Sequence, residues 1–122
     1  MHLDSYHCVQ CVEGVQETSW HLSFECPFSQ ACWLFLGINW NFHMESLHMI
    51  TQARLDFGNV IFRKVFILAC WSIWCHRNNI IFYNGERSFA FWRRIFEKEM
   101  KLVTLRVNLV FRDKISSFLS SL

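Results

Sequence analysis

Four side chains near the amino end have the types and spacing of a metal site. Cys8, Cys11, His21 and Cys26 form a C-x2-C-x9-H-x4-C array. Two cysteines separated by two residues can reach one ion from a single tight turn, and a set of three thiolates and one imidazole suits zinc better than magnesium or calcium. The array predicts one zinc ion, unless these are simply core cysteines, a residue type that is commonly buried. His7 is left outside the ligand set, because adjacent residues rarely both reach one ion.

The same stretch carries a family resemblance. The segment ETSWHLSFECPFSQACW (17–33), preceded by the cysteine pair, resembles the zinc-binding domain that follows the reverse transcriptase in plant LINE-type (non-LTR) retrotransposons. The segments WSIWCHRNNIIFYNG (71–85) and RRIFEKEMKLVTLRVN (93–108) are similar to later parts of such reading frames. The resemblance implies a reverse transcriptase zinc-binding domain. We expect it here as a freestanding C-terminal fragment, since the polymerase that precedes the domain in the family is missing.

Groups that could act in catalysis are sparse. The three aspartates, Asp4, Asp56 and Asp113, lie far apart in the sequence, whereas a reverse transcriptase needs paired aspartates to hold two metal ions. The sequence has no phosphate-binding glycine loop, nucleophile elbow or His-Glu-x-x-His helix. A zinc ion with four protein ligands keeps no position for a reacting water. We therefore expect a structural zinc and no enzymatic activity.

Nucleic-acid binding is the function that the remaining residues favour. The H-x4-C half of the array resembles a zinc knuckle, in which single-stranded bases stack on aromatic rings, and Trp20 and Phe24 could supply such rings. The basic side chains that could pair with phosphates of RNA or single-stranded DNA are Arg77, Arg87, Arg93, Arg94, Lys98 and Lys101. Alternatively, the aromatic rings pack over the metal, Arg77 and Asn78 cap a helix, and the other cations are solvated. Three acidic residues around the knuckle would repel phosphates: Glu13, Glu17 and Glu25.

Two other functions stay open. A domain separated from its polymerase would expose a former interface, so exposed aromatic side chains could bind a protein partner or a second copy of the chain. The apolar segment from Val60 to Tyr83 could associate with a membrane. Its most apolar part, Val65 to Cys75, has eleven residues with Ser72 the only polar one, whereas a span needs about 20. A buried helix is the favoured interpretation of this segment.

Composition and charge bound the architecture. The 122 residues are 52% hydrophobic and 17% aromatic, which excludes a disordered chain and predicts one domain. The polar start, MHLDSYHC, has no apolar signal segment, so we expect a reducing nuclear or cytoplasmic location, where cysteines bind metals rather than pair. Up to Asn59 one basic residue faces six acidic ones, a net charge of −5, and from Val60 eleven basic residues face four acidic ones, a net charge of +7. The asymmetry favours a polyanionic partner, pairing between the halves, or solvated helix faces.

The elements that must position the site are mainly helical. We predict a CCHC zinc knuckle-like segment (1–27) followed by about four helices packed as a small bundle (28–122). WHLSF (20–24) alternates in polarity and is expected to be a short extended piece. Pro27 and Gly37 bound the first predicted helix. Its inward residues are expected to be Phe28, Cys32, Trp33 and Phe35 or Leu36.

The hydrophobic pattern predicts three further helices after Gly37. Residues 44 to about 57 are expected to form a helix ended by Gly58, from the spacing of Leu47, Ile50, Arg54 and Leu55. Asn59 caps the long apolar segment, in which Cys70 and Cys75 are taken as small core residues, and Asn84–Gly85 ends it. Ser88 is expected to cap a last helix that runs to about the C-terminus. Its apolar stripe should pack on the helix over 65–75: Phe89, Trp92, Phe96, Met100, Val103, Val107 and Val110.

Overall fold

The amino-terminal segment folds as a closed turn. The computed structural model describes residues 7–11 and 14–122. The N–H of Cys8 donates to the carbonyl of Val15 (2.9 Å), and His7 and Gln16 form an isolated antiparallel bridge. Gly14 has φ +68°, a conformation that glycine adopts without steric cost. The chain therefore returns beside Cys8 before it reaches the second pair of predicted ligands.

The prediction that WHLSF is extended is wrong. Residues 21–25 form a π-helical turn, η1 (His21–Glu25). The hydroxyl of Thr18 accepts a hydrogen bond from the N–H of His21 (3.0 Å), and the carbonyl of Thr18 accepts one from the N–H of Leu22 (2.9 Å). Thr18 thus satisfies N–H groups at the start of a helix, as a capping residue does. This local cap, together with the burial of His21, Leu22 and Phe24, outweighs the alternating pattern.

Helix α1 (Pro27–Leu36) has the predicted bounds. Pro27 occupies its first turn, where a missing N–H costs nothing, and Gly37 ends it with φ +78°. Cys32, Trp33 and Leu36 are buried as expected, whereas Phe28 and Phe35 are only partly buried.

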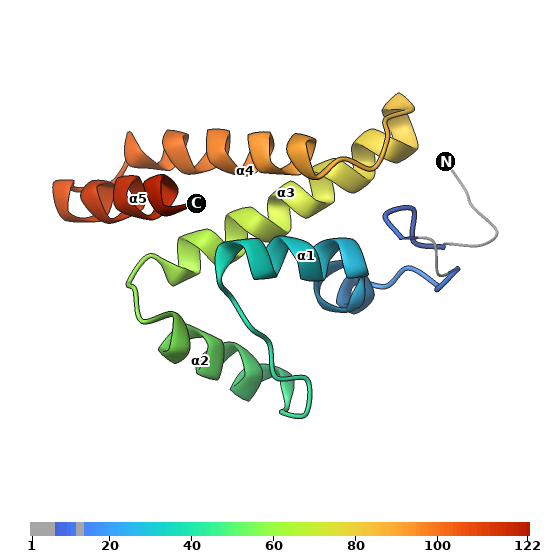
Figure 1. Cartoon of the computed structure of the whole chain (residues 1–122), viewed down its shortest axis with the longest axis horizontal. Helices are drawn as coiled ribbons and strands as arrows, with labels where there is room; N and C mark the ends of the chain where they lie inside the picture. The colour runs from blue at the N-terminus through green and yellow to red at the C-terminus, as the bar shows by residue number, and fades with distance from the viewer. Residues whose placement is uncertain (1–6, 12–13) are drawn as a thin grey trace.

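Helix α2 (Ser46–Phe57) exists where it was predicted and ends at Gly58, but it turns a different side inward. Its buried residues are Met49 and Ala53, while Leu47 and Leu55 are 67% and 68% exposed. Figure 1 shows α2 projecting away from the other helices. With few neighbours, α2 buries only a narrow side, and the hydrophobic spacing alone does not identify which one.

Helix α3 (Phe62–Tyr83) crosses the middle of the molecule, and α4 (Phe89–Thr104) returns along it (Figure 1). Asn84 ends α3 in the left-handed conformation (φ 55°), and the Ser88 hydroxyl accepts a hydrogen bond from the N–H of Phe91 (3.1 Å). Both boundaries agree with the sequence. Trp92, Phe96 and Met100 are fully buried, and α4 contacts α3 more extensively than any other helix does, which confirms the middle of the predicted seam. Its ends differ from the prediction: Phe89 and Val110 are 37% and 62% exposed, and Val107 and Val110 lie beyond the end of α4.

The last predicted helix is interrupted. It divides after Thr104, and α5 (Leu109–Ser121) folds back beside α4 (Figure 1). The side chain of Asn108 accepts a hydrogen bond from the N–H of Phe111 (3.1 Å) and so caps the new helix. Because α5 turns back, Ile115 lies in the core; one continuous helix would carry Ile115 away from the core. The described residues therefore contain five α-helices and η1, all built around one aromatic-rich core.

No single helix among the described residues is both long and apolar enough to cross a membrane; only the bent pair of α2 and α3, taken together, meets that test.

Candidate metal centre

The structure brings the four predicted ligands together. One donor atom from each of Cys8, Cys11, His21 and Cys26 lies within 4.8 Å of every other, and all four residues are buried. The sulfurs of Cys8 and Cys26 are 3.7 Å apart, and the sulfur of Cys11 is 3.6 Å from Nε2 of His21. Tetrahedral bonds of zinc length would separate two sulfurs by about 3.8 Å and a sulfur and a nitrogen by about 3.6 Å. Two donor pairs therefore have the separations of a tetrahedral zinc site, and the other pairs lie within 4.8 Å.

Local backbone structure explains the spacing of the second pair. Residues His21 and Cys26 are five apart, and the N–H of Cys26 donates to the carbonyl of His21 (2.7 Å), which closes the π turn of η1. A hydrogen bond from residue i+5 to residue i brings both residues to one side of the turn. Cys26 is also the residue that precedes α1, where Pro27 begins the helix.

The imidazole of His21 is oriented for binding through Nε2. This nitrogen faces the sulfur of Cys11, while Nδ1 lies 3.8 Å from a carboxylate oxygen of Glu25 on the outer side. A carboxylate on the far side of a ligating imidazole orients the ring and favours its metal-binding tautomer. The separation exceeds a direct hydrogen bond. Glu25, whose side chain is 54% exposed, is therefore a neighbour of the ring and not its hydrogen-bond partner.

Burial opposes charge on the sulfurs. Desolvation raises the pKa of the Cys8 thiol to about 12, and it also raises the pKa of Cys26. A buried thiolate needs a compensating cation, and a divalent ion among the donors would supply it and displace the thiol protons. Burial raises the thiol pKa of core cysteines in the same way, so the geometry of the four donors is the observation that indicates a cation site.

The remaining cysteines lie outside the cluster. Cys32 is fully buried in α1, and Cys70 is partly buried in α3; burial raises the pKa of both thiols, that of Cys70 to about 12. Cys75 is likewise partly buried, and burial raises its pKa. None of the six cysteines forms a disulfide. Cys32 is a core residue and Cys70 packs against the core, as predicted, whereas Cys75 does not belong to the core cluster.

A buried hydrogen-bond chain behind the cluster was not predicted. Gln10 lies between Cys8 and Cys11 in sequence, and its Oε1 is 2.6 Å from Nδ1 of His76 on α3. The backbone N–H of Ser88 donates to Nε2 of the same imidazole (2.9 Å), so the proton must reside on Nδ1, which donates to Gln10. Phe28 stacks on the ring at 4.1 Å. The turn that holds two ligands is thereby fixed to the junction of α3 and α4.

The sequence does contain a signal for His76. His76 lies on the buried side of α3, in the same helical register as Val65, Ala69, Ser72 and Ile73. A polar residue in that register must have internal partners. Burial lowers the pKa of His76 to about 4, so the ring is neutral at physiological pH.

Arg77 and Arg87, both predicted to contact nucleic acid, are bound within the protein. Arg77 Nη2 lies 2.8 Å from a carboxylate oxygen of Glu17, and its guanidinium also lies over the Trp74 ring. Arg87 Nε donates to the carbonyl of Val9 (3.0 Å). Both contacts join the two halves of the chain, and the Arg77–Glu17 ion pair is an instance of the intramolecular charge pairing that the charge asymmetry left open.

The basic residues of α4 are more accessible. Arg94, Lys98 and Lys101 are exposed and line one shallow hollow. Arg93 instead pairs with Glu97 (2.9 Å) and lies over the Phe35 ring. Helix α3 contacts both η1 and α4, whereas η1 and α4 make no extensive contact with each other within the described part of the chain. The cations of α4 are therefore separated from η1, whereas Arg77 and Arg87 contact the amino-terminal segment.

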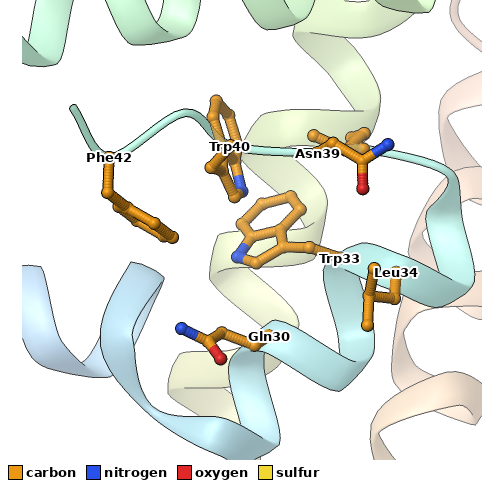
Figure 2. A pocket seen from close by; sticks show the side chains of 7 residues that line it. Gln30, Trp33, Leu34, Asn39, Trp40 and Phe42 are labelled. Atoms are coloured by element: carbon orange, nitrogen blue, oxygen red, sulfur yellow. The ribbon is translucent and has the colours of Figure 1, made fainter. Parts of the chain in front are cut away.

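Trp20 belongs to an aromatic cluster beside the metal site. It is 37% exposed and packs on Phe24, with ring centroids 4.7 Å apart, and on Phe42 at 6.5 Å. Next to it, α1 and the connector to α2 enclose a pocket of about 210 Å³, in which Figure 2 shows Trp33 between Trp40 and Gln30. Trp33 is almost fully buried, and its Nε1–H donates to the Ser23 carbonyl (2.7 Å). Phe24 is buried against Trp33, Trp40 and Phe66 and offers no free face to a base, while Trp20 keeps a partly free face.

No protein-family model, no curated protein and no solved structure matches this chain. The resemblance to the retrotransposon zinc-binding domain therefore stays a prediction, supported by the residues that carry it.

Proposed function

We propose that this chain is a non-catalytic zinc-binding domain that is related to the reverse transcriptase zinc-binding domain of LINE-type retrotransposons and binds RNA or single-stranded DNA. The observation that carries the proposal is the buried cluster of three cysteines and one histidine. Its donors are soft and borderline, and its dimensions suit tetrahedral zinc. Four protein donors complete that coordination, so the metal has a structural role.

The zinc assignment is tested by elemental analysis of purified protein. We expect one zinc per chain in the wild type and loss of the metal in Cys8→Ser and Cys26→Ser, because each removes a thiolate donor. Cys70→Ser is the matched control, since Cys70 is a partly buried core residue outside the cluster. A Cys8→Ser protein that keeps one zinc per chain would contradict the ligand assignment.

The nucleic-acid part of the proposal depends on the outer side of α4. Arg94, Lys98 and Lys101 follow one another at steps of four and three residues, which places them on one side of the helix. No ion pair is recorded for them within the described ranges, whereas Arg77 and Arg93 already have carboxylate partners. Their charges are therefore free to bind phosphates, with Glu97 the acidic residue in the same hollow.

Salt dependence tests this interface. Replacing Arg94, Lys98 and Lys101 together by Ala should weaken binding to a fluorescent oligothymidylate. It should also reduce the slope of log K against log salt by about 2, since each phosphate contact to a single strand contributes about 0.7. The control replaces Arg106 and Lys114, which are exposed outside that hollow, and should change the slope less. An unchanged slope in the triple variant would remove α4 from the contact surface.

Protein binding is a second candidate function, favoured by the outward side of α3. Ile67, Trp71, Trp74 and Phe82 are 49%, 50%, 43% and 57% exposed, and their spacing gives one apolar stripe. Sedimentation at increasing concentration separates the two functions. Self-association that persists at high salt and is lost in Trp71→Ala, without nucleic-acid affinity, would favour this candidate over the first.

A further inference from the structure

A groove with two arginines lies between α2 and α3. The two helices are bent by 118° relative to one another at the short connector that joins them, and α2 diverges from the bundle (Figure 1). The groove has a volume of about 430 Å³, within the range of small-molecule sites. Its lining residues are Ile50, Arg54, Asn59, Val60, Phe62, Arg63 and Phe66.

The groove combines an apolar floor, in which Val60 is 63% exposed and the Phe66 ring is partly buried, with cationic edges. The rings of Phe62 and Phe66 are 5.9 Å apart and tilted by 34°. Arg54 on α2 and Arg63 on α3 are both exposed, and no ion pair is recorded for either among the residues described. Two unpaired guanidinium groups attract an anion, and their donors match the oxygens of a phosphate.

The nearest acidic residues do not neutralise these arginines. Asp56 is two residues from Arg54, which places it about 200° away around the helix, and it accepts a hydrogen bond from Gln52 (2.9 Å). Asp113 lies with Lys114 in a separate hollow that shares only Asn59 with the groove. The groove also meets the first turn of α3, a helix of 22 residues, whose dipole favours an anion at this end.

We propose that this groove binds a nucleotide. The phosphate lies between Arg54 and Arg63. The planar base rests on the exposed side chain of Val60 and the partly buried Phe66 ring, since Phe62 is only 4% exposed. One planar apolar group and one anionic group account for both the apolar floor and the paired cations, and a nucleotide carries the two on one small molecule. The site involves neither α4 nor the metal cluster, so it does not depend on the proposed function.

The test is a titration of the zinc-supplemented full chain, isotopically labelled, with adenosine monophosphate, adenosine and inorganic phosphate as separate probes. We expect adenosine monophosphate to shift the amide signals of residues 59–66, with a dissociation constant below about 1 mM. Adenosine and phosphate should each bind about tenfold more weakly, because each keeps only part of the contacts.

Two exposed substitutions locate the site without disturbing the core. The double variant Arg54→Ala, Arg63→Ala should weaken binding of adenosine monophosphate by at least about tenfold, since both charge-assisted contacts are lost. Arg106→Ala, an exposed arginine outside the groove, should bind as the wild type does. A Val60→Ser variant should lose affinity for adenosine monophosphate but not for phosphate, because it removes only an exposed apolar contact to the base.

Three results would overturn the proposal. The first is equal affinity of the double variant and the wild type. The second is a set of shifts confined to α4. The third is displacement of the probe by an acidic phenylalanine peptide that binds more tightly, which would assign the groove to a protein ligand. The α4 substitutions are measured separately with oligothymidylate. A negative result at one site therefore does not affect the interpretation of the other.

Discussion

Gln10 and His76 hold the metal turn without contributing ligands. Gln10 Oε1 accepts the proton of His76 Nδ1, and the Ser88 N–H occupies the other ring nitrogen. A protonated imidazole would carry a second N–H at Nε2, where the chain already presents a donor. The buried ring is therefore compatible only with its neutral form, which agrees with a pKa lowered to about 4 by desolvation.

His76 should make the stability of the protein sensitive to acid. Its native pKa is about 4 and its unfolded value 6.5, so the unfolded chain binds a proton first as the pH falls. The contribution is present above pH 6.5 and is lost as the pH falls toward 4. The free energy of unfolding should decline by about 1.4 kcal/mol per pH unit within that window. Denaturant unfolding of wild type and His76→Gln measures it.

His76→Gln keeps an acceptor for the Ser88 N–H but does not titrate, so its unfolding free energy should depend less on pH between 6.5 and 4. His48→Gln on exposed α2 is the control and should retain the wild-type dependence. Equal pH dependence in wild type and His76→Gln would show that the imidazole is not buried in its neutral form.

At the scale of elements, the amino-terminal turn is joined to the end of α3 by an ion pair. Glu17 and Arg77 approach to 2.8 Å, and their side chains are only 11% and 13% exposed. Little water screens this pair, unlike Arg93 and Glu97 within α4, whose side chains are 42% and 29% exposed. The two pairs have the same chemistry in different environments.

A double-mutant cycle should separate the two environments. We expect a coupling energy of about 1–3 kcal/mol for Glu17→Gln with Arg77→Gln, because each single substitution leaves a partly buried charge unpaired. The same cycle on Arg93 and Glu97 should give about 0.3–0.5 kcal/mol. Chemical unfolding of the four proteins in each cycle measures both values. Equal coupling in the two cycles would contradict a structural role for the Glu17–Arg77 contact.

At the scale of the whole molecule, side-chain contacts tie the candidate metal site to the α3–α4 junction, so the two regions should be stabilised together. Three contacts connect them: Gln10 with His76, Glu17 with Arg77, and the Val9 carbonyl with Arg87. Helix α5 has no such connection and packs mainly against α4. Loss of the ion should therefore loosen the molecule unevenly.

Removal of the metal by a chelator should lower the free energy of unfolding by several kcal/mol, because binding energy of a structural zinc is folding energy. Amide hydrogen exchange should increase in residues 8–26 and around Ser88, and less in α5. The control is chelator added to Cys26→Ser, where exchange should not change further. Uniform acceleration through α5 would show that the metal stabilises the fold as a whole rather than these two regions.

The sequence by itself determined the features that depend on neighbouring residues. The spacing of Cys8, Cys11, His21 and Cys26 identified the cluster, because each pair of ligands is close in sequence and a single reversal of the chain brings the two pairs together. Gly37, Gly58 and Asn84 marked helix ends, because their left-handed conformations are available to few residue types. The seam of Trp92, Phe96 and Met100 followed from helical periodicity.

Only the tertiary structure decided the features that depend on contacts between distant segments. The cap at Thr18 and burial of η1 replaced an extended piece by a helical turn. The core position of Ile115 required a break before α5, although no glycine or proline marks it. From the sequence, Arg77 could have bound phosphates; in the structure it pairs with Glu17, which lies 60 positions earlier in the chain. Periodicity shows that a residue is buried or charged, but its partner depends on how the whole chain packs.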